Sequence, residues 1–218
     1  MSKDTRIRVG GSWVEPDDIL HYDGSSWNPV QEGFVRVGGQ WVQIWPPRQP
    51  PTTDTFNATS SGLWHHYSTG WTGYGDQPEQ GAHSVGNHRG CWFYGNQPWS
   101  SALAQDGGRK VTKVEIRVTR IAGHMGWGSP NPISPRFWYH RHNSRPSGRP
   151  SLYGGPFLGS GVARGETRWL TLPSGWNRIF EDGTLRGIAV FTPDGGPISA
   201  YEGPSQSASA GQIRISHE

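Results

Sequence analysis

Aromatic side chains set among glycines and amides are the most chemically suggestive feature of this sequence. Between residues 64 and 99 they are interleaved with Gly, His, Asn and Gln, and a further Trp lies in the glycine-rich stretch 123–135. The flat face of an indole packs against the C–H face of a sugar, while nearby amides hydrogen-bond its hydroxyls. The pattern therefore predicts glycan-binding candidates, namely Trp71, Tyr74, Trp99 and Trp127. A role in the core or in a subunit interface stays open for the same residues, because a chain poor in Leu must fill its core with Trp and Tyr.

The residues capable of metal binding or catalysis form no complete set. His140 and His142 are two positions apart, which places both rings on one face of a strand, but no third metal ligand lies nearby in the sequence. The carboxylates show no paired arrangement of the kind that glycoside hydrolysis needs. Cys91, between Gly90 and Trp92, has no accompanying triad pattern, so a buried thiol is favoured over a nucleophile. We expect no catalytic residue, no metal and no cofactor, and hence no enzyme.

A repeat of 14 residues occupies the first 45 positions. Its copies are 8–14, 22–28 and 36–42, and they place Trp13, Trp27 and Trp41 in strict register. A Gly-Gly or Gly-Ser pair between two short runs favours a two-residue turn with positive φ, so each copy is predicted to be a β-hairpin. Isolated hairpins are marginal in water, which makes the three Trp residues candidates for assembly, packed on one another or on a partner chain.

A segment rich in proline divides the chain. Residues 46–53 contain four prolines and predict a semi-rigid extended linker. We therefore expect three parts: hairpin repeats over 1–45, the linker over 46–53, and one domain over 54–218. The last part has a suitable size for a single β-sandwich.

The composition predicts an all-β fold. The 218 residues include 32 Gly and 18 Pro, which interrupt helices, and 12 Trp supply apolar area that aliphatic residues do not. The clearest strand is 113–119, where Val114, Ile116 and Val118 alternate with polar residues. Further strands are predicted at 63–67, 91–94, 136–142, 168–172, 187–192, 198–201 and 212–216. About eight strands without a helical period favour a jelly-roll-like β-sandwich.

Charge and hydropathy argue against two classes of partner. The chain has 20 Lys plus Arg against 17 Asp plus Glu, and it lacks a run of like charges, so we expect no nucleic-acid partner. No apolar stretch approaches the length of a membrane span, and the N-terminus lacks the apolar segment of a secretory signal. We therefore expect no membrane insertion and synthesis in a cytoplasm.

Two groups of segments resemble a known family. The first group is Val-Glu-Ile-Arg-Val-Thr-Arg at 114–120 with Phe-Trp-Tyr-His-Arg-His-Asn-Ser-Arg-Pro at 137–146; the second comprises 161–173, 182–190 and 211–215. Together they look like the C-terminal β-sandwich module of minor tail proteins from bacteriophages of actinobacteria. The Val-Gly-Gly-x-Trp-Val repeats are similar to short repeats common in phage tail proteins. Both resemblances rest on structural motifs, and they carry over no site residues.

The resemblance implies a virion component at or near the distal tail. Its partners would be other tail proteins, with host attachment through the larger domain. A homotrimer is the favoured oligomer, because three chains could bury the Trp hairpins around one axis. Three repeats in one chain could instead form a pseudo-threefold unit. The alternative function is a carbohydrate-binding module that recognises host envelope glycans through its aromatic loops.

Overall fold

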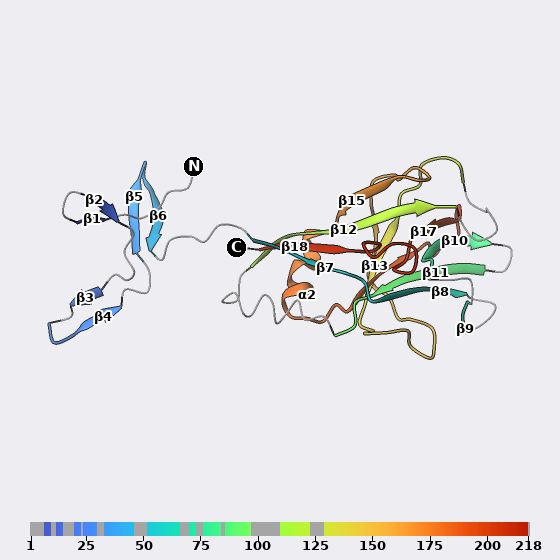
Figure 1. The fold of residues 1–218 in the computed structure, drawn as a ribbon, viewed down its shortest axis with the longest axis horizontal. Coiled ribbons are helices and arrows are strands. Elements are labelled where there is room, and N and C mark those ends of the chain that lie inside the picture. The colour runs from blue at the N-terminus through green and yellow to red at the C-terminus, as the bar shows by residue number, and fades with distance from the viewer. Residues whose placement is uncertain are drawn as a thin grey trace. The chain divides into compact units, whose positions relative to one another are not determined.

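The chain folds into two compact units, Met1–Pro50 and Pro51–Glu218. The computed structural model (Figure 1) describes residues 7–9, 12–14, 20–22, 24–29, 33–45, 52–65, 70–72, 76–83, 86–96, 110–122 and 129–217. The fold is all-β, as the composition predicts. Each unit is considered by itself below.

The smaller unit contains the three hairpins that the repeat predicts. They pair β1 (Ile7–Val9) with β2 (Ser12–Val14), β3 (Leu20–Tyr22) with β4 (Trp27–Pro29), and β5 (Gly33–Val37) with β6 (Gln40–Trp45). The pairing register recurs with the sequence period, because Arg8 lies opposite Trp13, Tyr22 opposite Trp27 and Arg36 opposite Trp41. In the third hairpin Gly38 and Gly39 have φ values of 57° and 84°, which fulfils the expectation of a turn with positive φ.

The larger unit is built on a 12-stranded antiparallel sheet (Figure 1). Its main path runs β14-β13-β16-β11-β10-β17-β12-β18-β7, while β15 pairs with β12 and β8 pairs with both β11 and β9. The strands are β7 (Thr52–Phe56), β8 (Ser60–His65), β9 (Gly70–Trp71), β10 (Glu79–His83), β11 (Gly86–Phe93), β12 (Val111–Ile121), β13 (Arg136–His140), β14 (Tyr153–Leu158), β15 (Thr167–Thr171), β16 (Gly187–Phe191), β17 (Ser199–Tyr201) and β18 (Ile213–His217).

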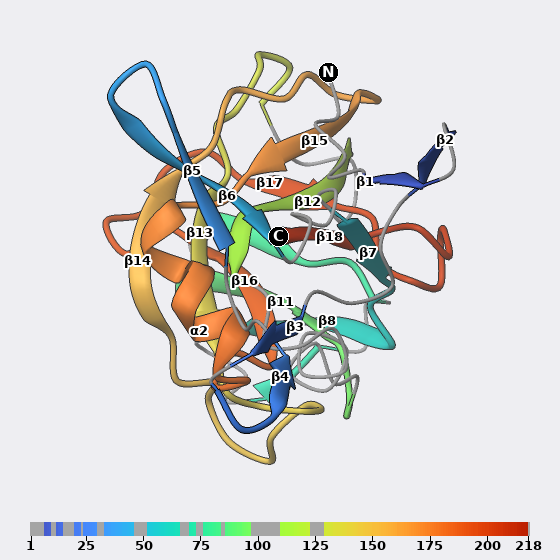
Figure 2. The same ribbon diagram turned by 90° about the vertical axis from the view of Figure 1, so that its left-hand side faces the viewer.

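This sheet curls round a core to which both of its ends contribute. Figure 2 shows β13 and β14 on the side opposite β7 and β18. From β12 come Val114, Ile116 and Val118, as the alternation predicts, and they belong to the same buried cluster as Trp92 and Phe137 from the other end of the path. The strand β17 pairs with β10 on one side and with β12 on the other, so backbone pairing is continuous between the two ends of the path.

All eight strands predicted in the larger unit are present, and four others were not predicted. The additional strands are β7, β9, β10 and β14. Thr52 and Thr53 belong to β7, opposite His217 and Ser216, so the predicted linker 46–53 is too long by these two residues. Threonine is β-branched and suits a strand, which is why pairing with β18 extends past the proline segment.

A short helical segment completes the core. The 3₁₀ helix η2 (Ser174–Trp176) leads into α2 (Asn177–Glu181), and the two place Trp176 and Phe180 in the main buried cluster. Five residues are too few to produce a helical period, so the sequence did not predict α2. Neither of these described helices has the length and apolarity needed to cross a membrane.

A substitution at Gly90 of β11 tests how closely two segments of the larger unit approach each other. A Cβ at this position would lie 2.3 Å from the backbone nitrogen of Glu79 and 2.6 Å from the carbonyl carbon of Pro78. We expect Gly90→Ala to lower the free energy of unfolding by about 3 kcal/mol, because backbone cannot move aside cheaply. Gly148→Ala is the control, since nothing lies within 4 Å of its Cβ. Equal urea-unfolding midpoints for the two variants would contradict this packing.

Candidate functional site

The hairpin unit carries most of the exposed apolar side chains that are described. Six large apolar side chains are exposed in the described residues, and four of them belong to this unit: Trp27, Phe34, Val37 and Trp41. Trp27 is 66% exposed and Trp41 is 71% exposed, at equivalent positions of their hairpins. The backbone of Trp13 takes the corresponding place in β2, but its side chain lies outside what is described.

One face of the third hairpin brings apolar groups together. Phe34 and Arg36 are two residues apart on β5, and Trp41 lies directly opposite Arg36, so all three share a face. Phe34 is 48% exposed. The Arg36 Nε donates a hydrogen bond of 3.4 Å to the Gly39 carbonyl, which holds this side chain beside the turn. The result is an apolar surface with one fixed cation.

Trp71, a predicted glycan contact, is packed inside the larger unit. Its ring makes edge contacts with Trp64 and Phe93, both with centroids 5.6 Å apart. Its indole N–H donates to the Pro146 carbonyl at 2.7 Å, and the Arg145 guanidinium carbon lies 5.8 Å from its centroid. The half-buried ring thus fastens the 141–152 segment to the sheet. The other three candidates, Tyr74, Trp99 and Trp127, lie outside the described residues.

The rings of His140 and His142 lie close together, but both ring nitrogens of His140 already take part in hydrogen bonds. Its Nδ1 accepts a hydrogen bond from the His142 backbone N–H at 3.3 Å, and its Nε2 donates to the Trp92 carbonyl at 3.1 Å. Burial, with a smaller contribution from His142, lowers the pKa of His140 to about 3. Among the described residues no group of three or more His, Cys, Asp or Glu is placed to hold a metal ion.

Cys91 lies on the outer face of the sheet, the face turned away from the main core. There it forms a second buried cluster with Phe93 and Ala189, covered by Trp71, Trp138 and Leu152. Burial raises the pKa of the Cys91 thiol, which keeps it protonated and unreactive.

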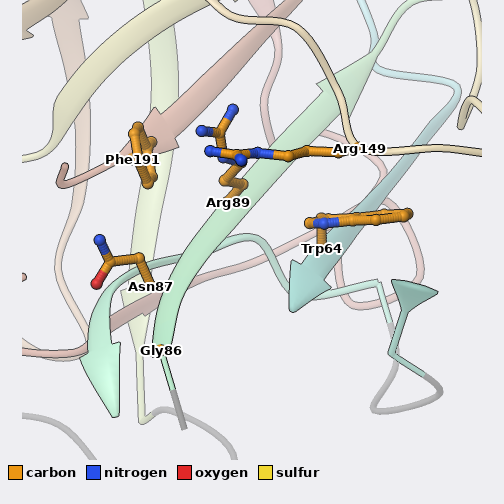
Figure 3. A pocket seen from close by; sticks show the side chains of 6 residues that line it. All are labelled: Trp64, Gly86, Asn87, Arg89, Arg149 and Phe191. Atoms are coloured by element: carbon orange, nitrogen blue, oxygen red, sulfur yellow. The ribbon is translucent and has the colours of Figure 1, made fainter. Parts of the chain in front are cut away.

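Beyond this cluster the outer face is hollowed into a cleft of about 280 Å³ (Figure 3). Its lining residues are Trp64, Gly86, Asn87, Arg89, Arg149 and Phe191. Figure 3 shows Arg149 extending from its loop toward Arg89, with Trp64 and Phe191 on either side. This cleft combines aromatic walls with charged groups.

The sequence did not single out the residues of this cleft. A partial signal existed, because only 3 of the 20 basic residues are Lys, and Arg suits stacking on aromatic rings. Trp64 and Phe191 are 127 positions apart in the sequence, however, and only the pairing of β11 with both β8 and β16 brings them to either side of Arg89.

Comparison with protein-family models and with curated proteins found no match.

The buried imidazole of His140 predicts a pH-dependent stability. In the unfolded chain a histidine binds its proton near pH 6.5, whereas His140 stays neutral down to about pH 3 when folded. Between these values the unfolded state binds more protons, so stability falls as the pH falls. We expect His140→Gln to flatten this dependence, so that between pH 6.5 and 4.5 it loses about 2 kcal/mol less than the parent chain. Parallel urea-unfolding curves for parent and variant across this range would refute the assignment.

Proposed function

We propose that this chain is a structural protein of a bacteriophage tail, assembled through its hairpin unit and involved in host attachment through its larger unit. The observation that carries the proposal is the exposure of Trp27 and Trp41 at equivalent positions of repeated hairpins. Repetition at a fixed period is characteristic of parts that stack or assemble.

Exposed indoles of this kind are suited to burial against another protein surface. A two-stranded hairpin has little stability of its own in water, and each Trp offers roughly 150–250 Å² of surface for burial. Apolar side chains grouped in this way on a small unit mark an interaction surface. The partner we propose is a second copy of the chain or another tail protein.

The exposure also bears on the arrangement of the three repeats. If they formed a closed pseudo-threefold unit within one chain, their Trp side chains would be buried against each other. Trp27 and Trp41 instead remain 66% and 71% exposed. This favours burial between chains, and a closed homotrimer is the oligomer that we propose.

A second candidate function is glycan binding by the larger unit. It is supported by the cleft on the outer face, whose lining includes the Trp64 and Phe191 rings and the side chain of Asn87. Trp71 is less suited to this role, because its indole N–H is bonded to Pro146 and its ring edges meet two other aromatic rings. Glycan binding is compatible with a place in the tail.

Replacing the exposed indoles should weaken assembly. We expect the double variant Trp27→Ser/Trp41→Ser of the full chain to lose its oligomeric state, since an interface Trp contributes about 2 kcal/mol or more. Leu158→Ser is the matched control, because Leu158 is 62% exposed on β14, outside the hairpins. Light scattering measures the mass of each protein. A double variant with the mass of the parent chain would exclude the hairpin surface as the interface.

The place in the tail has its own test. We expect the intact chain among the proteins of purified virions of the phage that encodes it, identified by mass spectrometry. Gold-labelled antibodies should then bind at the tail rather than the head. Virions that lack the protein, or that carry it in the head, would rule out the proposed function while leaving the glycan-binding alternative to be judged separately.

A further inference from the structure

Three strands place an aromatic–arginine–aromatic row on the outer face of the sheet. Arg89 of β11 lies directly opposite Trp64 of β8 on one side and Phe191 of β16 on the other. Residues opposite one another in an antiparallel pair share a face, so these three side chains lie together. Asn87, two residues before Arg89, extends the row on the same face.

The Arg89 guanidinium is held in place. Its central carbon lies 4.3 Å from the centroid of the Phe191 ring, a cation–π distance. Its Nη1 donates a hydrogen bond of 3.0 Å to the Pro150 carbonyl. That bond uses one of five N–H donors of the planar group. A positioned guanidinium with donors to spare is suited to recognise an anion.

Arg149 brings a second positive charge to the same cleft. Its side chain is exposed and extends toward Arg89 (Figure 3), and within the described part of the chain it has no ion-pair partner. Burial first, and then Arg149, lower the pKa of Arg89 to about 10. None of the six lining residues is acidic. Two neighbouring cations without a carboxylate between them repel each other, and a bound anion would relieve this repulsion.

The size and walls of the cleft narrow the class of ligand. A volume of about 280 Å³ is near the lower end of the range of ligand sites and suits one small ring. Trp64 supplies an apolar wall, the Phe191 ring holds the Arg89 guanidinium against its face, and the two guanidinium groups supply forked donors for oxygen atoms.

We propose that this cleft binds a sugar unit that carries an oxyanion, either a carboxylate or a phosphate. This proposal extends the second candidate function, glycan binding. It rests on that function only for the sugar part of the ligand and not for the anion. It is independent of the place of the chain in a tail. The anion lies between Arg89 and Arg149, and the sugar ring lies against Trp64.

Calorimetric titrations of the full chain, at constant ionic strength, test the anion and the sugar separately. The probes are methyl glucuronide, neutral methyl glucoside, glucose 6-phosphate and inorganic phosphate. We expect both charged sugars to bind at least about tenfold more tightly than methyl glucoside, as charge-assisted hydrogen bonds require. We also expect them to bind more tightly than inorganic phosphate.

Two variants and one control assign the effect to the cleft. Arg149→Gln should weaken binding of the charged sugars by about tenfold, and Arg149→Lys should recover only part of it, because the forked donors are lost. Arg178→Gln removes the same charge from the exposed surface of α2 and should leave binding unchanged. Thermal unfolding of each variant verifies that the fold is retained.

Each outcome then has a definite meaning. If inorganic phosphate binds as tightly as the charged sugars, the cleft is an anion site, but the proposal that it recognises a sugar is wrong. Three other results would overturn the anion site itself. They are equal affinity for charged and neutral sugars, an equal loss of affinity in Arg149→Gln and Arg178→Gln, and no binding of any probe at millimolar concentration. The assembly of the hairpins is unaffected by any of these results.

Discussion

The fully buried Trp92 donates its indole N–H to the Glu202 carbonyl at 3.0 Å, and the Tyr94 hydroxyl donates to the Gly211 carbonyl at 2.5 Å. A core made largely of aromatic residues depends on such bonds, because each buried N–H or O–H needs an acceptor. Gly211 also has φ of 67°, and a Cβ there would lie 2.3 Å from Cδ1 of Trp92. Aromatic packing therefore dictates where glycine-rich loops must run, and it ties them to the sheet.

The same constraint accounts for the difference between the two units. In the larger unit the indole N–H groups of Trp92 and Trp71 bond the carbonyls of Glu202 and Pro146, and each bond ties the ring to a segment far away in sequence. The hairpins, with three residues in most strands, are too short to enclose an indole in this way. Their Trp side chains gain most by burial against another chain, which is the physical basis on which we propose assembly through the small unit.

Sequence patterns revealed the elements whose residues alternate or repeat. The strand at 113–119 and the 14-residue hairpins were predictable because period-2 alternation and Gly-Gly turns are local signals. By contrast β10 buries Glu79 and Gln80, and β14 contains Gly154, Gly155 and Pro156, so neither has an apolar pattern. The cleft could not be predicted, since the neighbours of Arg89 depend on long-range pairing. The packing of Trp71 against Trp64 and Phe93 depends in the same way on strand pairing, while its predicted contact with a glycan stays a prediction.

We propose that the hairpin unit, and not the larger unit, holds chains together. Sedimentation equilibrium of the full chain and of a chain shortened to residues 51–218 tests it most directly, because the two compact units divide at this point. We predict three times the single-chain mass for the full chain and a single-chain mass for the shortened one. The same oligomeric state for both proteins would contradict it.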